Sequence, residues 1–198
     1  MEIYLIRHGE TTANVEKRFA GVLDVPLTEK GIGQAVLAGE KLKDVQFDAF
    51  YCSNLYRAHE TAKIIGKHQA IVPSPLESLQ EMNFGIWEGK KMEEIQSESG
   101  ELLNQWFAEF ENFKVPEGES VKEMFERVTN AYKKIIEPFS LDSDVKIAIV
   151  AHGGVIQSLL SFLCFGDNTG YWKFRIENCG INRLEYVMGY PVVRGINQ

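Results

Sequence analysis

The sequence begins with Met1-Glu2-Ile3-Tyr4-Leu5-Ile6-Arg7-His8-Gly9-Glu10, an apolar run that stops at charged and small residues. This pattern predicts a buried β-strand over residues 1–6 that ends in a loop at His8. Residues 145–151 repeat it, because a nearly continuous apolar run, typical of a strand buried on both faces, ends at His152. In parallel sheets, ligands bind beyond the carboxyl ends of the strands. The two histidines are therefore expected at the ligand-binding edge of one sheet.

Segments with helical periodicity alternate with further short apolar segments. A helix is expected over 28–42, with Ile32, Ala35, Val36 and Leu42 on its buried face. Other helices are expected from an N-cap at Ser53 to Gly66 and at 102–113, 121–139 and 155–163, and other strands at 47–52, 71–73, 182–187 and 192–193. Apolar strands that alternate with helices favour an α/β fold. We therefore predict a single domain over residues 1–198 with a three-layer α/β/α fold, in which the central layer is a mostly parallel sheet.

The composition restricts the class of protein. The chain has 198 residues, of which 44% are hydrophobic and 25% charged, as in an ordinary globular domain, and its net charge is −7. An acidic chain is not expected to bind nucleic acid or an anionic membrane surface, because both attract Lys and Arg. The apolar runs are too short to span a bilayer, and the N-terminus does not resemble a signal peptide. Three scattered cysteines, Cys52, Cys164 and Cys179, predict reduced thiols and a cytoplasmic protein.

The negative charge is concentrated in one segment. Residues 77–126 contain thirteen Glu, four Lys and no Asp or Arg, a net charge of −9, whereas the remainder of the chain carries +2. This segment therefore offers few cations that could hold a second acidic group of a ligand. The distribution favours, as a ligand, a monophosphate whose remaining part is neutral or weakly charged.

Five residues have the chemistry needed to bind and transfer a phosphoryl group. Arg7 can hold a phosphate through two N–H groups, and His8 can act as a nucleophile. Arg57 is expected near a helix N-terminus, where free N–H groups favour an anion. Glu81, in a loop rich in glycine and aromatic residues, could be a general acid, and His152 could place a second imidazole beside the same ligand. Each residue alone also fits a role without chemistry, as a loop histidine, a surface arginine or one more glutamate. The histidines lack the spacing of metal ligands, so neither a metal nor a cofactor is expected.

Taken in order along the chain, the motifs resemble those of the histidine phosphatase superfamily, the phosphoglycerate mutase-like proteins. Four blocks that together cover nearly the whole chain carry the resemblance: Arg7-His8-Gly9-Glu10-Thr11 with Asn14, Arg18, Gly21, Asp24 and Pro26-Leu27-Thr28; Ser53-Asn54-Leu55-Tyr56-Arg57-Ala58 with Thr61-Ala62; Glu81 with Phe84-Gly85 and Trp87-Glu88-Gly89; and Val150-Ala151-His152-Gly153-Gly154. Each block is short, but four of them in family order are specific. The resemblance implies a phosphoglycerate mutase-like fold.

The resemblance also implies a mechanism. His8 is the expected nucleophile, which forms a phosphohistidine, and its other ring nitrogen should donate to a carbonyl that fixes the tautomer. Arg7, Arg57 and His152, the last as an imidazolium, should surround the phosphoryl oxygens without a metal ion. Glu81 is expected to be the general acid for the leaving oxygen and then the general base for water. Further donors to the substrate are expected from the side chain of Asn14 and from the backbone N–H groups of Gly21 and Gly153.

The residues after Glu81 distinguish two enzymatic branches of this family. Mutases are similar to the chain in the core but have an Arg and a Tyr after the acid, where this chain has Met82-Asn83-Phe84. The pattern Phe84-Gly85-Ile86-Trp87-Glu88-Gly89 instead resembles phosphatases, which include α-ribazole phosphatases and broad-specificity phosphomonoesterases. Ala20 departs from the family, because mutases have a hydroxyl residue there and several phosphatases have Gln.

We therefore predict a cytoplasmic, metal-independent, acid-type phosphatase that hydrolyses a small phosphorylated metabolite, with an α-ribazole phosphate as one candidate. The alternatives are a phosphoglycerate mutase and a catalytically silent binding protein on the same fold. The helices within about 87–139 are expected to include a lid insertion over the site. The expected partner is a small-molecule phosphate ester, without nucleic acid or membrane, and the chain is expected to be a monomer or a homodimer.

Overall fold

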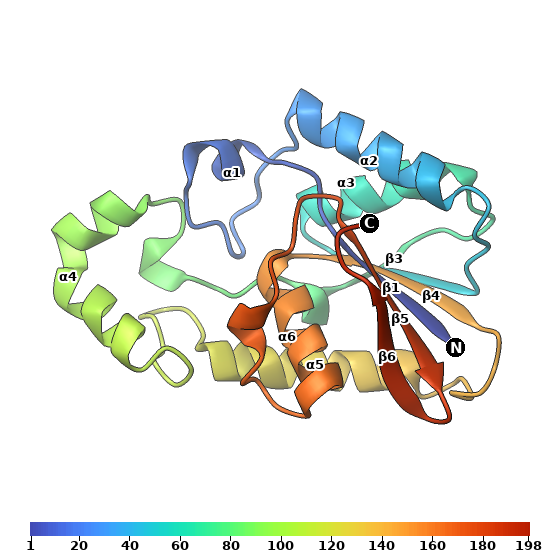
Figure 1. Cartoon of the computed structure of the whole chain (residues 1–198). Helices are drawn as coiled ribbons and strands as arrows, with labels where there is room; N and C mark the ends of the chain where they lie inside the picture. Colours follow the sequence, from blue (N-terminus) through green and yellow to red (C-terminus); the bar gives the residue numbers. More distant parts are fainter.

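The computed structural model describes residues 1–198, and its centre is a six-stranded sheet between two layers of helices (Figure 1). The elements in chain order are β1 (Glu2–Arg7), α1 (Thr12–Glu16), α2 (Glu29–Leu42), β2 (Ala49–Ser53), α3 (Tyr56–Ile65), β3 (Ser74–Leu76), α4 (Met92–Ala108), α5 (Val121–Ile136), β4 (Lys146–Ala151), α6 (Gly153–Phe165), β5 (Ile181–Val187) and β6 (Tyr190–Gly195). The strand order is β3-β2-β4-β1-β5-β6, in which the first four strands are parallel and the last two are antiparallel. The predicted α/β fold with a mostly parallel sheet is confirmed.

Each face of the sheet packs against its own helices. Along β1, Ile3 and Leu5 lie in a core that includes residues of α5 and α6, whereas Tyr4 and Ile6 lie in a core that includes residues of α2 and α3. The side chains of β4 alternate between the same two cores. Because both faces are covered, both sets of side chains are apolar, which explains why these strands are continuous apolar runs.

Three local predictions are wrong. The strand expected at 71–73 lies instead at Ser74–Leu76, as β3, which pairs with β2. Ser53 ends β2 and does not cap the next helix; its Oγ accepts from the N–H of Leu55, which is the N-cap of α3. On α2, Ile32 and Val36 are exposed, and the buried face is formed mostly of small residues: Gly31, Ala35, Ala38, Gly39 and Leu42. Small side chains allow α2 to pack closely against α3.

The helices of the acidic segment are shorter or differently placed than predicted. α4 ends before Phe110 and Phe113, which pack against the core from the following loop, and α5 ends before Phe139. α5 packs against α6, whereas α4 extends away from the sheet, at the left of Figure 1, although both helices contribute side chains to the main core. A lid within 87–139 therefore concerns α4 and its loops more than α5, and it stays a proposal. None of the helices combines the length and the apolar character that a membrane span requires.

Candidate active site

The sheet brings the two predicted histidines together. β1 and β4 are parallel neighbours with Arg7 opposite Ala151, so the residues that follow the two strands emerge side by side. The rings of His8 and His152 have centroids 5.2 Å apart, and the two residues are 4% and 0% exposed. A pair of buried imidazoles thus lies at the carboxyl edge of the parallel strands, where the fold class places ligands.

His8 is held as a neutral imidazole. Its Nδ1 lies 2.8 Å from the carbonyl oxygen of Gly9, so this nitrogen carries the proton and donates it, which leaves the lone pair on Nε2. Burial, and then the charges of Arg57 and Arg7, keep the pKa of His8 well below its ordinary value of 6.5. The predicted tautomer and a neutral ring at physiological pH are both features of this geometry.

The two arginines are fixed by backbone carbonyls. The Nη1 of Arg7 donates to the carbonyl of Ile176 at 2.7 Å, while its Nε is buried without a partner. Arg57, in the first turn of α3 and 1% exposed, donates to three carbonyls of one loop: Ala20, Gly21 and Leu23. Burial is the main cause that lowers the pKa of each guanidinium, but an arginine stays charged. Two fixed cations therefore flank the histidines.

His152 differs from the sequence prediction in its charge. Both of its ring nitrogens are buried without a partner in the protein, as is the Nε of Arg7. Burial, followed by the charges of Arg57 and other neighbours, holds the pKa of His152 well below 6.5, so the ring is neutral and the expected imidazolium is not the form at rest. Buried polar atoms without partners are costly and rare, and their gathering here indicates a site built to form hydrogen bonds with a ligand.

Glu81 joins this group from a loop far away in the sequence. Its Oε1 accepts from the backbone N–H of Met82 at 3.0 Å, and its Oε2 accepts from that of Gly154 at 3.0 Å. Gly154 lies in the first turn of α6, so the carboxylate is placed at the N-terminus of the helix that His152 caps. A Cβ at Gly154 would lie only 2.6 Å from Oε1, so glycine is needed for this approach.

Tyr171 is a component of the site that the sequence did not reveal. Its buried side chain places the hydroxyl 2.8 Å from the position that a Cβ on Gly154 would occupy, on the side of Glu81. Burial, and secondarily the Glu81 carboxylate, raise the pKa of Tyr171, so the hydroxyl keeps its proton. No local pattern marks this residue, because it lies in a short 3-10 turn after α6.

The three additional donors predicted from the sequence have different environments. Asn14 accepts through Oδ1 from the N–H of Thr11 and from the side chain of Asn178, which orients its amide. Gly153 lies beside the site, since a Cβ there would be 3.6 Å from the Nε of Arg7. The N–H of Gly21, however, donates to the Glu88 carboxylate at 3.0 Å, so it is engaged by the protein itself.

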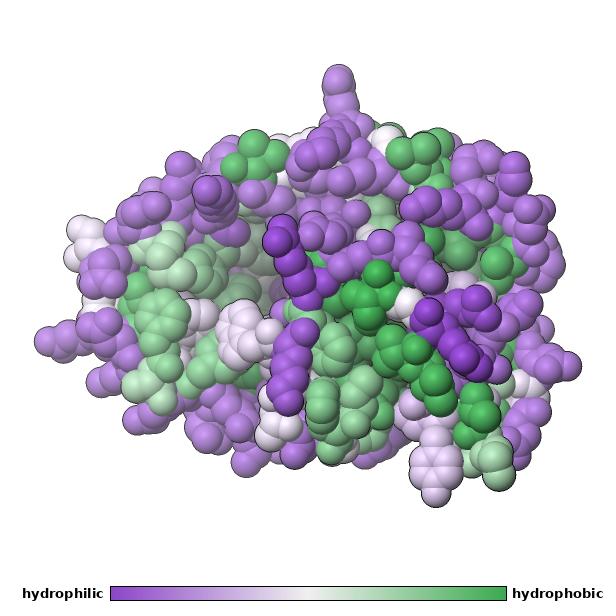
Figure 2. Space-filling model, viewed as in Figure 1, coloured by the Kyte–Doolittle hydropathy of each residue, from purple (hydrophilic) through white to green (hydrophobic).

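Two cavities open on either side of Glu81. One, of about 630 Å³, includes Arg7, Glu81 and Gly153 in its wall and is rimmed by Trp172 and Arg175. The other, of about 620 Å³, is lined by residues of the 77–83 loop and by three from elsewhere: Val22, Glu119 and Arg127. The space-filling view shows a hollow between α4 and the body of the protein (Figure 2). No group of three or more His, Cys, Asp or Glu residues is arranged to hold a metal ion.

Comparison with known proteins agrees with this arrangement. The model of the histidine phosphatase superfamily (branch 1) matches residues 3–198. The adenosylcobalamin/α-ribazole phosphatase of Salmonella typhimurium is 32% identical over all of this chain and 96% of its own length. A probable phosphoglycerate mutase, GpmB, of Yersinia pestis is 32% identical over 94% of this chain and 85% of its own length.

The fold comparison points to the same group of proteins. The crystal structure of a putative α-ribazole-5'-P phosphatase from Escherichia coli superposes with a TM-score of 0.93 and 28% identity, covering 100% of this chain and 96% of that one. Family, fold and the order of the motifs thus agree over the whole chain. The chain belongs to the histidine phosphatase superfamily, branch 1, and is an enzyme of its phosphatase type, a hydrolase of phosphate monoesters.

Proposed function

We propose that this chain hydrolyses a small phosphorylated metabolite through a phosphohistidine on His8, with Glu81 as general acid and then general base. The observation that carries this proposal is the state of His8: a neutral ring with a fixed tautomer, buried beside Arg7, Arg57 and His152. Phosphoryl transfer requires mainly positioning and charge stabilisation from the protein. Two guanidiniums and an imidazole N–H can supply both without a metal ion.

The proposed reaction has two steps. The lone pair on Nε2 of His8 attacks phosphorus while the bond to the ester oxygen breaks, and protonated Glu81 gives its proton to that oxygen. Water then attacks the phosphohistidine, Glu81 takes a proton from it, and inorganic phosphate leaves His8 in its starting form. A phosphate dianion beside His152 favours the protonated form of that ring, so bound substrate opposes the effect of burial on its pKa.

The cavity that is lined by Arg7, Glu81 and Gly153 is our proposed site for the leaving part of the substrate. Its rim carries the exposed indole of Trp172, and Phe110, from the loop after α4, packs on that ring with centroids 4.8 Å apart. We therefore propose α4 and this loop as the lid.

The acidic segment offers little to hold a second anion, and the two cations of this cavity other than Arg7 have partners: Arg175 pairs with Glu177 at 2.8 Å, and Lys173 lies over the ring of Phe165. We therefore propose a monophosphate with a neutral or weakly charged remainder, of which α-ribazole phosphate, named for two relatives, is one candidate.

The cellular setting is also a proposal. All three cysteines are free, and two of them are buried, which fits the reducing cytoplasm expected from the sequence. We propose that the chain acts there on a soluble phosphate ester, as a monomer or a homodimer.

The test is hydrolysis of a panel of phosphate esters in the presence of EDTA. The unmodified protein should turn over, His8→Ala should lose activity by at least about 1,000-fold, and His68→Ala, which removes an exposed histidine paired with Glu40, should not. A label on His8 that is labile to acid and stable to base would identify the intermediate. Full turnover by His8→Ala, or loss of activity in EDTA that added metal restores, would refute the proposed mechanism.

The same panel distinguishes hydrolysis from mutase activity. Neutral-tailed monophosphates should be hydrolysed faster than phosphoglycerate, and phosphoglycerate should not be converted to its isomer. We expect no isomer because Met82 and Asn83 stand where mutases place other residues. Isomer formation that exceeds phosphate release would show that the chain is a mutase and would refute the proposed hydrolysis.

A further inference from the structure

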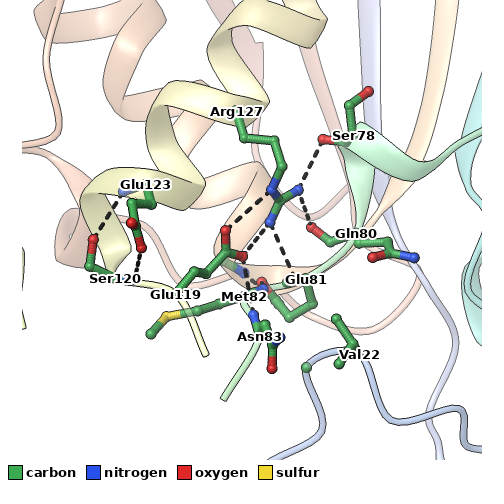
Figure 3. A network of polar contacts seen from close by, with 12 residues as sticks. Val22, Ser78, Gln80, Glu81, Met82, Asn83, Glu119, Ser120, Glu123 and Arg127 are labelled. Carbon is green, nitrogen blue, oxygen red and sulfur yellow. Dashed lines mark hydrogen bonds and ion pairs between the residues drawn. The ribbon is translucent and has the colours of Figure 1, made fainter. Parts of the chain in front are cut away.

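Arg127 contacts the loop that carries Glu81 (Figure 3). The residue lies on α5, and its Nη1 donates to the carbonyls of Ser78 at 3.0 Å and Gln80 at 2.9 Å. Its Nη2 donates to the carbonyl of Glu81 at 3.4 Å and to the carboxylate of Glu119. One side chain thus holds the carbonyls of two residues that precede the general acid and the carbonyl of the acid residue itself.

Glu119 extends this contact to the other side of Glu81. Its carboxylate also accepts from the Nε of Arg127 at 3.3 Å and from the backbone N–H of Asn83 at 3.1 Å. The N–H of Glu119 in turn donates to the carbonyl of Asn83 at 2.9 Å. The side chains of Arg127 and Glu119 are 27% and 17% exposed, so solvent screens this ion pair less than a surface one. The loop is therefore held on both sides of Glu81.

The hydrogen bonds of Arg127 distinguish it from the arginines that face the ligand. A guanidinium has five N–H donors, and the five contacts of Arg127 with Ser78, Gln80, Glu81 and Glu119 use all of them. Arg7 makes one hydrogen bond through Nη1 and keeps a buried Nε without a partner. Arg127 has no donor left for a phosphate, although it lies near the site.

The loop needs such support because regular structure does not supply it. Residues 80–84 belong to no helix or strand, so their carbonyls have no ladder to pair with. A general acid must lie within hydrogen-bonding distance of the leaving oxygen, and a misplacement of about 1 Å can cost about 100-fold in rate. We propose that Arg127 and Glu119 are positioning residues that set the location of the Glu81 carboxylate for proton transfer. This inference rests on the proposed function of Glu81.

The dependence of the rate on the leaving group distinguishes a positioning role from a merely structural one, because a structural defect would lower the rates for all esters. Dinitrophenolate leaves without a proton, whereas an alkoxide needs one from Glu81. For Arg127→Met, we expect the first-turnover rate with an alkyl phosphate to fall about 10- to 100-fold, and the burst rate of dinitrophenolate release to change less than about threefold.

Three further proteins complete the experiment. Arg183→Met removes an arginine that pairs with Glu2 at the far end of β1, at 2.8 Å, and should change neither rate. Arg127→Lys keeps the charge but not the five donors, and should lose alkyl ester activity as Arg127→Met does. Glu119→Gln keeps the size of the side chain and should show the same selective loss, which covers the case that Arg127→Met fails to fold.

The outcomes separate this inference from the proposed function. Equal losses for both esters in Glu119→Gln and in folded Arg127 variants, or no loss for either, would overturn the positioning role while the unmodified protein remains a phosphatase. Recovery of alkyl ester activity in Arg127→Ala by added guanidinium would support it. Absence of turnover by the unmodified protein with every ester would refute the proposed function, and the inference with it.

Discussion

Replacement of Gly154 by Ala tests whether the position of the Glu81 carboxylate controls the rate. The new Cβ would lie 2.6 Å from Oε1 of Glu81 and 2.8 Å from the hydroxyl of Tyr171, whereas ordinary contacts begin at 3.4 Å. The carboxylate must therefore retreat by about 0.8 Å, since the helix backbone of α6 cannot. A displacement near 1 Å costs about 100-fold, or about 2.7 kcal/mol of transition-state stabilisation.

The assay is kcat/KM with an alkyl phosphate, combined with thermal unfolding. Stability should change little, because alanine favours a helix over glycine by up to about 1 kcal/mol, which offsets part of the strain. Gly33→Ala is the matched control, since it lies on α2 with nothing within 4 Å of its Cβ, and it should leave the rate unchanged. In a Glu81→Gln background, Gly154→Ala should cost little more. Activity of Gly154→Ala within about threefold of the unmodified protein would refute the reasoning, because a displaced acid cannot work at full rate.

Two other predictions concern the buried histidines and the carboxylate of Glu88. The pKa values of His8 and His152 are depressed in the folded state, so only the unfolded state takes up protons just below pH 6.5. The unfolding free energy should therefore fall below pH 6.5 by up to about 1.4 kcal/mol per pH unit for each histidine. Urea denaturation above and below pH 6.5 measures this change, and an unfolding free energy that does not depend on pH would contradict the prediction. Glu88→Gln should lower the unfolding free energy by about 1–3 kcal/mol and raise KM, because its carboxylate accepts from four backbone N–H groups, three of them in the loop that anchors Arg57. Glu60→Gln, at a surface ion pair, is the control for that comparison, and equal effects of the two changes would contradict the role of Glu88.

The parts of the fold that the sequence predicts are those set by local physics. The apolar runs that become β1 and β4 have to be buried on both faces, and the strand ends then locate His8 and His152. The helix expected from residue 28 is α2, and Thr28 caps it, because the Thr28 hydroxyl accepts from the N–H of Gly31. The sequence cannot tell by periodicity alone that β1 and β4 are neighbours, although this pairing brings the two rings together.

The parts that the sequence misses depend on contacts between distant residues. Gly21 was expected to donate to the substrate, but Glu88, 67 residues away, accepts from its N–H. Arg127 contacts carbonyls 46 to 49 residues earlier in the chain, and the Tyr171 hydroxyl and the Glu81 carboxylate both lie beside Gly154. No window of a helix or strand contains such pairs, so only the assembled fold reveals them.

The acidic segment also contributes to the backbone structure around the site. Glutamates 81, 88 and 119 all lie within it, and each carboxylate accepts from backbone N–H groups of loops around the site. Their charges therefore help to hold the backbone around the site in place. The cations divide in the same way, because Arg127 is saturated by the acid loop while Arg7 keeps an unpaired Nε. A net negative enzyme can thus bind a phosphate, since its carboxylates are matched to amides and its free cations face the ligand.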